Sequence, residues 1–462
     1  LYKIFKYSIY NFFINFVSLL LVKFDLYFSI FFKLYLYKSY NYFKKKDNQN
    51  LEKINKKILF RLIRNNKYLD LFAPLYHQSE GYKFGWELCK LKFISQETIN
   101  KIFEFDQKIL FTPKTFGKFG HSLLIDIFIR GQLTNILEKK EIIIAGNKKS
   151  FSNYKILKQL FSKNANFQPN FLNTSVNKTI YDNCEVNLNY FKTQSGEYLD
   201  LRKYFCKMQL EWEKKNFKNY IKLEKIDEHR GLDFLKKYQI DLYKNWYVLI
   251  SVRENEDSFE LRNSIFESYI PAIHEITKRG GFVIRYGNLS GQIKNTNIKN
   301  FLDLRGNEEL NQNLPFLVKN AKFQISTGTG TSVLPMLLDI PNLITNWSPI
   351  THIMGTKKDL LLPKMFFNSR GKVVNFQDRL SDKFGAVETS YMANQLQVSV
   401  KDNSEQDINL AVIHMFEKCD NENFKTGENQ NKFKDRMNKN NFYPIEISNS
   451  LEQTYPDFFY EN

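Results

Sequence analysis

Short apolar runs alternate with amphipathic stretches along the chain from Lys108 onward. Between Lys108 and Phe161 the apolar runs predict strands. The stretches between them repeat their apolar residues every three or four positions, which predicts helices. The expected strands are Ile109–Thr112 and Glu141–Ala145, and the expected helices are His121–Leu133 and Ser152–Phe161. Strands and helices that alternate at this spacing favour a parallel, Rossmann-like sheet.

The same rhythm returns after a less regular stretch that contains one charged helix, Leu201–Tyr220. The second set of expected strands is Tyr247–Val252, Phe282–Arg285, Asn300–Leu304, Phe323–Ile325 and Asn342–Thr345. The helices expected between them are Ser264–Arg279, which the pair Gly280-Gly281 ends as a C-cap, Glu308–Asn320, and Val333 to about Asp339. We therefore expect an α/β protein with two doubly wound domains.

The first 45 residues are strongly apolar and aromatic. Their longest uncharged run, Tyr7–Val22, has 16 residues and would be about 24 Å long as a helix, shorter than a bilayer core of about 30 Å. Lysines flank this run, which is typical of a segment that lies in the interface of an anionic membrane. The alternative is a helix that packs on its own protein.

The predicted organisation is an apolar helical segment at 1–45, a helical lead-in at 46–106, and Rossmann-like domains at 107–240 and 241–400. Residues 401–462 are expected to form a helix at Ser404–Lys418, a flexible linker rich in Asn and Lys at Asp420–Asn441, and an aromatic tail that docks on the body.

Charge and cysteine usage narrow the function. The chain has 67 Lys and Arg against 49 Asp and Glu, a net charge of +18, which suits anionic substrates, an anionic membrane surface or nucleic acid. AT-rich coding sequence would also enrich Lys, and no nucleic-acid-binding signature is present, so no nucleic-acid partner is expected. The four cysteines form no CxxC pair, which favours a reducing compartment over a disulfide framework or a zinc site.

The loop Ser326–Ser332 is the strongest candidate for chemistry, because a strand leads through small residues into a helix. Backbone N–H groups and hydroxyls there could hold a phosphate; the residues concerned are Thr327, Gly328, Thr329, Gly330, Thr331 and Ser332. Arg253 and Arg285 follow or end their strands, at the same expected sheet edge. The alternatives are a turn without a ligand and arginines that pair with surface carboxylates.

The loop after the first expected strand is a second candidate by position, and it contains Lys114, Gly117, Gly120 and His121. No Asp-x-Asp pair, HExxH motif or nucleophile elbow occurs, so neither a metal site nor a covalent nucleophile is predicted.

Val252–Gly287 resembles a bacterial family of GT-B glycosyltransferases associated with surface-polysaccharide (lipopolysaccharide or capsule) gene clusters. The similar residues are Arg253, Arg262-Asn263, Tyr269, Gly281, Arg285 and Gly287. Further on, Pro341, Asn346 and Pro363-Lys364 match the family's pattern, and the early Gly117–His121 is similar to its G-x-x-GH motif.

The resemblance implies transfer of a sugar from a nucleotide-sugar donor to a glycan or lipid-linked acceptor, in a GT-B-like fold with a donor domain at 241–400 and an acceptor domain at 107–240. The donor would bind to the small-residue loop with Arg253, Arg285, Asn346 and Lys364. His121 would be the general base, oriented by Asp126, with Glu254 as an alternative base. No metal or other cofactor is implied, and the protein would be cytoplasmic and peripheral to, or anchored at, the inner face of the plasma membrane.

Two other functions fit the same pattern. A nucleotide-sugar epimerase can share this fold, but it would need paired carboxylates where the sequence offers mainly arginines and one histidine. A non-catalytic scaffold of a glycan assembly complex would bind no nucleotide sugar.

Overall fold

The computed structural model describes residues 108–111, 119–146, 151–168, 190–195, 197–254, 260–288, 297–381, 384–385, 387–421 and 427–459. The predicted segments 1–45 and 46–106, together with Lys114 and Gly117, lie outside the described residues. The described residues form two compact units. The first contains 108–111, 131–146, 164–168, 190–195 and 197–204, and the second contains 119–130, 152–163 and the described residues from 205 onward.

The first unit is built on a small parallel sheet. Its strands are β1 (Lys108–Phe111), β2 (Glu141–Ala145) and β3 (Asn166–Gln168), in the order β1-β2-β3. A hairpin of β4 (Tyr190–Lys192) and β5 (Tyr198–Asp200) also belongs to this unit. The apolar residues of β1 and β2 are buried, which explains why they read as continuous apolar runs.

The second unit contains a seven-stranded sheet in which every pair is parallel. The strands are β6 (Tyr247–Ser251), β7 (Phe282–Arg285), β8 (Phe301–Asp303), β9 (Phe323–Ser326), β10 (Asn342–Trp347), β11 (Leu360–Pro363) and β14 (Glu446–Ile447). Their order is β14-β11-β10-β9-β6-β7-β8, so the chain runs outward from β6 on one side and then returns to begin the other side at β9. The predicted parallel α/β architecture is therefore confirmed.

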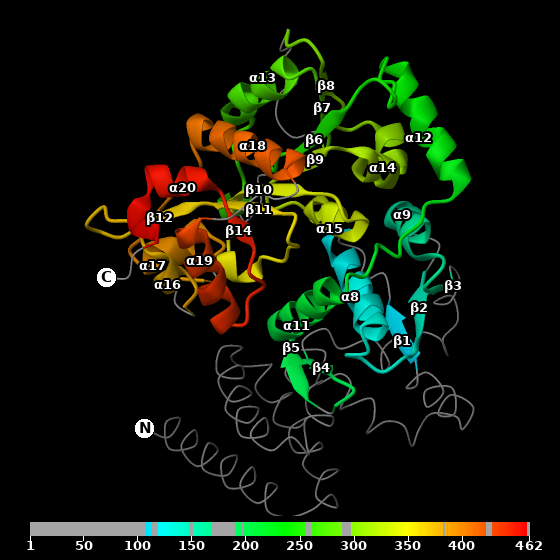
Figure 1. The fold of residues 1–462 in the computed structure, drawn as a ribbon, viewed down its shortest axis with the longest axis horizontal. Helices are drawn as coiled ribbons and strands as arrows, with labels where there is room; N and C mark the ends of the chain where they lie inside the picture. The colour runs from blue at the N-terminus through cyan, green and yellow to red at the C-terminus, as the bar shows by residue number, and fades with distance from the viewer. Residues whose placement is uncertain are drawn as a thin grey trace, which may run out of the picture. The chain divides into compact units, whose positions relative to one another are not determined.

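Helices connect these strands and pack against one another (Figure 1). Those between consecutive strands are α13 (Ile270–Lys278), α14 (Glu308–Asn320) and the short α15 (Leu334–Leu338). Helix α18 (Glu405–Asp420) packs on α13, and α12 (Lys225–Lys237) packs on α14. Helices α8 (Ser122–Leu133), α9 (Phe151–Phe161) and α11 (Leu201–Lys214) occupy the earlier part of the chain.

The C-terminal part is folded where the sequence predicts a flexible linker. Within Asp420–Asn441 the structure has helix α19 (Glu428–Lys439), whose residues Phe433 and Met437 are buried. These apolar residues are four positions apart and lie on one helix face, a spacing that the Asn- and Lys-rich composition conceals. The tail beyond α19 adds β14 to the sheet, and helix α20 (Asn449–Thr454) packs on α18. This agrees with the prediction that the tail docks on the body.

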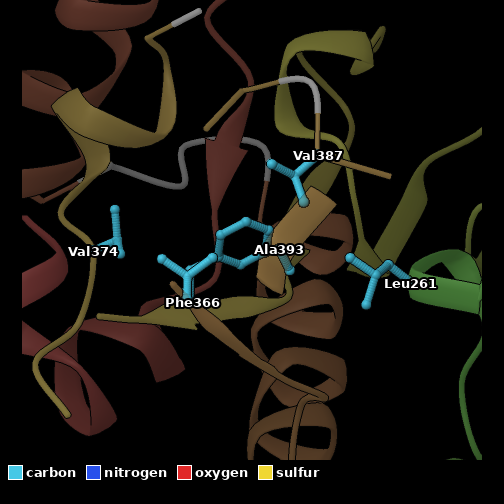
Figure 2. Packing of buried hydrophobic residues seen from close by; sticks show 6 residues of the cluster. Leu261, Phe366, Val374, Val387 and Ala393 are labelled. Atoms are coloured by element: carbon cyan, nitrogen blue, oxygen red, sulfur yellow. The ribbon is translucent and has the colours of Figure 1, made fainter. Parts of the chain in front are cut away.

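A buried apolar cluster holds the segment that precedes α13 (Figure 2). Leu261 lies in the 3-10 turn η7 (Glu260–Arg262), and it packs with residues from the antiparallel pair β12 (Met365–Phe367) and β13 (Ser399–Lys401), from helix α17 (Ser390–Gln395) and from nearby loops. The other buried members are Phe366, Val374, Val387, Ala393 and Val398. Burial of Leu261 fixes the residue that follows it, Arg262.

No helix in the described ranges has an apolar stretch long enough to cross a membrane.

Candidate functional site

The order of strands in the second unit creates a topological switch point between β6 and β9. In such sheets ligands bind beyond the carboxyl ends of the strands where the strand order reverses. The ends of these strands are joined by two hydrogen bonds: the backbone N–H of Thr327 donates to Ser251 O (3.2 Å), and that of Arg253 donates to Thr327 Oγ1 (2.8 Å). Residues predicted to bind a phosphate therefore lie at the switch point.

The small-residue loop is ordered by its own side chains. Ser332 Oγ donates to Thr329 O (2.7 Å), and the Thr331 hydroxyl lies 3.2 Å from that of Thr329 and 3.4 Å from that of Ser251. The backbone N–H groups of Gly328, Gly330 and Thr331, by contrast, meet no acceptor among the described residues. They can donate to an anion without breaking a bond in the protein.

The helix after this loop is shorter than predicted. The chain forms a 3-10 turn, η9 (Gly330–Val333), before the five-residue helix α15. Asp339 then ends α15 in a left-handed conformation, with φ of 61°. A helix of this length has a small dipole. The capacity of the loop for an anion therefore rests on its N–H groups and hydroxyls more than on a helix terminus.

Arg262 belongs to the segment Val252–Gly287 that resembles the glycosyltransferase family, and the sequence predicts no role for it. In the structure it lies against the small-residue loop. Its Nη2 donates to Gly328 O (2.5 Å), and a Cβ added at Gly328 would lie 3.1 Å from Arg262 Nε. Because Gly328 has no side chain, the Arg262 guanidinium can approach the backbone of the loop closely. The signal in the sequence is the pair Arg262-Asn263 after a charged, polar stretch, but its proximity to the loop follows only from the fold.

His121 and Gly120 lie against the same loop. They end the 3-10 turn η5 (Phe119–His121), which packs on η9, and both segments belong to the second unit. A Cβ added at Gly120 would lie 3.3 Å from Gly330 Cα. The His121 side chain is exposed. The structure therefore brings together the ends of the two loops that the sequence analysis treats as separate candidates.

Asp126 is fully buried one turn further along α8. Its carboxylate pairs with Arg130 Nε, 3.1 Å from Oδ1 and 2.9 Å from Oδ2, and Oδ1 accepts a hydrogen bond from Tyr220 (2.7 Å). Burial raises the pKa of Asp126, and Arg130 and Tyr220 oppose that rise. Because these contacts engage the carboxylate with Arg130 of the same helix and with Tyr220, its orientation of His121 stays a prediction.

Arg285 and Glu254 belong to one buried ion network. Arg285 pairs with Glu254 and lies 3.4 Å from Asp303 Oδ2, and Arg305 contacts the same two carboxylates. The Arg285 guanidinium also stacks 3.4 Å above the Phe266 ring centroid. Burial raises the pKa of Glu254 against the effect of Arg285 and Arg305. The chain itself thus supplies counter-ions for Arg285 and cations for Glu254.

Asn346 and Lys364 are also engaged by the protein. Asn346 Nδ2 donates to Ser264 Oγ (2.7 Å) and Tyr269 OH (3.2 Å), and its Oδ1 accepts from the backbone N–H of Asn403 (2.6 Å). The Lys364 ammonium is buried against Asp402, and burial lowers the pKa of Lys364 while Asp402 opposes that shift. Their predicted roles toward a donor remain predictions.

In the part of the chain that the structure describes, no group of three or more His, Cys, Asp or Glu residues is arranged to hold a metal ion.

No protein-family model and no curated protein matches the sequence. Several solved structures are similar in fold. One is a glycosyl transferase of family 9 from Veillonella parvula, with 8% identity, a TM-score of 0.44, and 67% of this chain and 97% of that chain covered. Another is the ADP-heptose lipopolysaccharide heptosyltransferase II of E. coli, with 9% identity, a TM-score of 0.38, and 63% and 98% covered. A UDP-GlcNAc 2-epimerase from Methanocaldococcus jannaschii has 13% identity, a TM-score of 0.19, and 53% and 70% covered. Similarities of this size do not identify a function.

Proposed function

We propose that this protein is a glycosyltransferase whose nucleotide-sugar donor binds at the switch point between β6 and β9. The observation that carries the proposal is the loop Gly328–Thr331, whose unengaged N–H groups face no acceptor among the described residues at the place where such sheets bind ligands. Arg262, held on the adjacent η7, adds a guanidinium that suits a diphosphate.

His121 is proposed as the general base because it is exposed and lies on the turn that packs against the donor loop. In the reaction, the acceptor hydroxyl loses its proton to His121 and its oxygen bonds to the anomeric carbon of the donor sugar. The bond from that carbon to the phosphate oxygen breaks, and the nucleoside diphosphate leaves with the electron pair. N–H groups of the loop and arginines would stabilise its charge without a metal.

The finer features rest on the family resemblance. The acceptor is proposed to be a glycan or lipid-linked sugar in bacterial surface-polysaccharide synthesis, and the place of reaction the cytoplasmic face of the plasma membrane. Arg253 is proposed to contact the donor, since its N–H group is bonded to the loop through Thr327. Arg285, Lys364 and Asn346 are less suited to that role, because their polar groups are engaged by Glu254, Asp402 and Asn403.

A binding assay tests the donor site. UDP, GDP, CDP, ADP and CMP are titrated by calorimetry into the wild type, Arg262→Met and Arg279→Met. Arg279 is the control, because it is an arginine at the C-terminal end of α13 that pairs with Glu275 at 2.7 Å. Loss of a charge-assisted hydrogen bond worth about 1.5–3 kcal/mol should weaken binding about 10- to 100-fold in Arg262→Met and leave Arg279→Met unchanged.

The outcome also separates the alternative functions. If no nucleotide binds at millimolar concentration, the donor site is absent and the scaffold is favoured. If a nucleotide sugar binds and its sugar is isomerised without any acceptor, the epimerase replaces the transferase.

A further inference from the structure

Arg130 is a buried side chain that none of the proposed chemistry uses. It belongs to α8, and only 2% of the residue is exposed. Its Nε pairs with Asp126 on the same helix, Nη1 donates to Gln209 Oε1 of α11 (3.3 Å), and Nη2 donates to Met336 O of α15 (2.9 Å). The guanidinium carbon also lies 4.7 Å from the Trp212 ring centroid. One side chain therefore joins residues of three helices, and the residues that it joins all belong to the second unit.

The helices that it joins carry the two halves of the candidate site. Helix α8 follows directly on η5, which ends in Gly120 and His121, and α15 follows directly on η9, which begins at Gly330. The turns η5 and η9 pack on each other, with almost no room between Gly120 and Gly330. The bond from Arg130 to Met336 thus links the two helices that follow these turns. Figure 1 shows α8 beside α15.

We infer that Arg130 is a positioning residue that sets the distance between the His121-bearing turn and the donor loop. Its catalytic consequence rests on the proposed function, whereas its structural consequence does not. The planar guanidinium presents several N–H groups in fixed directions, so it can bond to Asp126, Gln209 and Met336 at once, which a lysine ammonium on a flexible stem does less well. Tyr220, bonded to Asp126, braces the pair from the segment after α11.

The neighbouring Asp126 dictates the choice of variant. Removing Arg130 alone would leave a fully buried carboxylate without its cation and could unfold the protein. The test therefore uses Asp126→Asn/Arg130→Met, which removes both charges, beside the conservative Arg130→Lys. The control is Lys418→Met, which breaks an ion pair with Glu446 (2.6 Å) in the C-terminal part and leaves Lys434 3.5 Å from the same carboxylate.

Hydrogen exchange measured by mass spectrometry on the full chain reads the structural consequence. In the double variant we expect amides of residues 119–124 and 332–334 to exchange about tenfold faster, with a smaller effect in Arg130→Lys and none at these residues in Lys418→Met. Unchanged exchange at 119–124 in the folded double variant would overturn the inference, as would an equal increase in Lys418→Met.

Nucleotide titration and turnover separate this inference from the proposed function. If the proposed function holds, the double variant should keep nucleotide affinity within about threefold and lose turnover at least tenfold, because the base moves relative to a loop that still binds phosphate. Arg130→Lys, which keeps Asp126, should lose turnover in the same direction to a smaller extent. If the wild type binds no nucleotide, the proposed function fails, and the exchange experiment still decides whether Arg130 positions the two turns. A double variant that loosens residues 119–124 yet keeps full turnover would refute the catalytic part.

Discussion

At the scale of single residues, much of the block that resembles the glycosyltransferase family has a structural role here. Asn346 and Tyr269, 77 positions apart, are hydrogen-bonded to each other. Gly281 lies against the Trp246 ring, and Gly287 has a φ of 134°, in a region that suits glycine. In this chain these residues build the edge of the sheet, while Arg253, Arg262 and the small-residue loop are the members that we propose to contact a ligand.

Asn346 is expected to be among the most sensitive positions in the second unit. Asn346→Ala removes the partners of Ser264, Tyr269 and the Asn403 backbone in a fully buried place. Unsatisfied buried groups should lower the free energy of unfolding by about 2–4 kcal/mol, measured by urea denaturation. Asn394→Ala, at an exposed position of α17, is the control and should change it by less than about 0.5 kcal/mol. A loss below about 1 kcal/mol in Asn346→Ala would show that the network is dispensable.

Gly281 is a second position where the surrounding structure tolerates only the residue that is present, because the Trp246 ring leaves no room for a side chain. In Gly281→Ala the new methyl group would lie 2.3 Å from a Trp246 ring carbon, so the ring or the backbone must move. We expect a loss of about 1–3 kcal/mol in thermal or urea unfolding. Gly427→Ala places its methyl group in open space and should cost well under 1 kcal/mol. Equal effects of the two substitutions would argue against the close packing.

At the scale of elements, the sequence predicts best those segments whose burial is uniform. Glu141–Ala145 and Phe282–Arg285 match β2 and β7 at both ends, because the residues between their first and last positions are apolar and buried. Glu308–Asn320 matches α14, whose start is marked by the Asn307 side chain accepting from Leu310 N (2.8 Å). The sequence predicts charged helices less well. Helix α11 ends at Lys214 instead of Tyr220, and the sequence pattern does not predict α12 or α19.

Some features of the candidate site can be predicted from the sequence, and others depend on the fold. The loop Thr327–Ser332 could be found from the sequence, because a run of small residues between a strand and a helix is a local pattern. The partners of Arg285 could not, since Glu254 is 31 positions away and Asp303 is 18 away. Likewise the approach of Gly120 to Gly330 depends on how helices pack. Contacts set by topology carry no signature in one sequence.

The attachment of the C-terminal tail gives a prediction about pH. Burial alone would raise the pKa of Glu446, but His414, whose Nε2 lies 3.5 Å from Oε1, and ion pairs with Lys418 (2.6 Å) and Lys434 (3.5 Å) outweigh it and lower the pKa to about 2. A depressed pKa means that the folded state favours the carboxylate. The stability that it contributes is present above the ordinary value of 4.5 and is lost as the pH falls toward 2.

Glu446→Gln should therefore reduce the free energy of unfolding by about 2–3 kcal/mol at pH 7, with the difference from the wild type shrinking as the pH falls from 4.5 toward 2. Chemical denaturation at a series of pH values measures this. Glu428→Gln, on the exposed surface of α19 where Glu428 pairs with Lys432, is the matched control and should leave the curve unchanged. A pH-independent deficit in Glu446→Gln would indicate lost packing instead of lost charge.

At the scale of the whole molecule, the proposed donor site lies entirely within the second compact unit. Ser251, Arg262, the loop after β9 and the turn that ends in His121 all belong to it, whereas β1, β2 and β3 belong to the first unit. A ligand stabilises what must be folded to bind it. Nucleotide binding should therefore slow hydrogen exchange more in some segments than in others. The segments with the largest decrease in exchange rate identify the location of the site.

At a nucleotide concentration of about 100 times the dissociation constant, the ligand should add about 2.7 kcal/mol to openings that destroy the site. Amides of β6 and β9 that exchange through such openings should then slow by up to about 100-fold, while those of β1 and β2 should keep their rates. Arg262→Met at the same free nucleotide concentration should show a proportionally smaller effect, because it binds more weakly. Protection concentrated in β1 and β2 would place the nucleotide in the first unit and refute the donor site. Equal protection everywhere would mean that the units open together, so the site would then have to be located by the Arg262 and Arg279 variants.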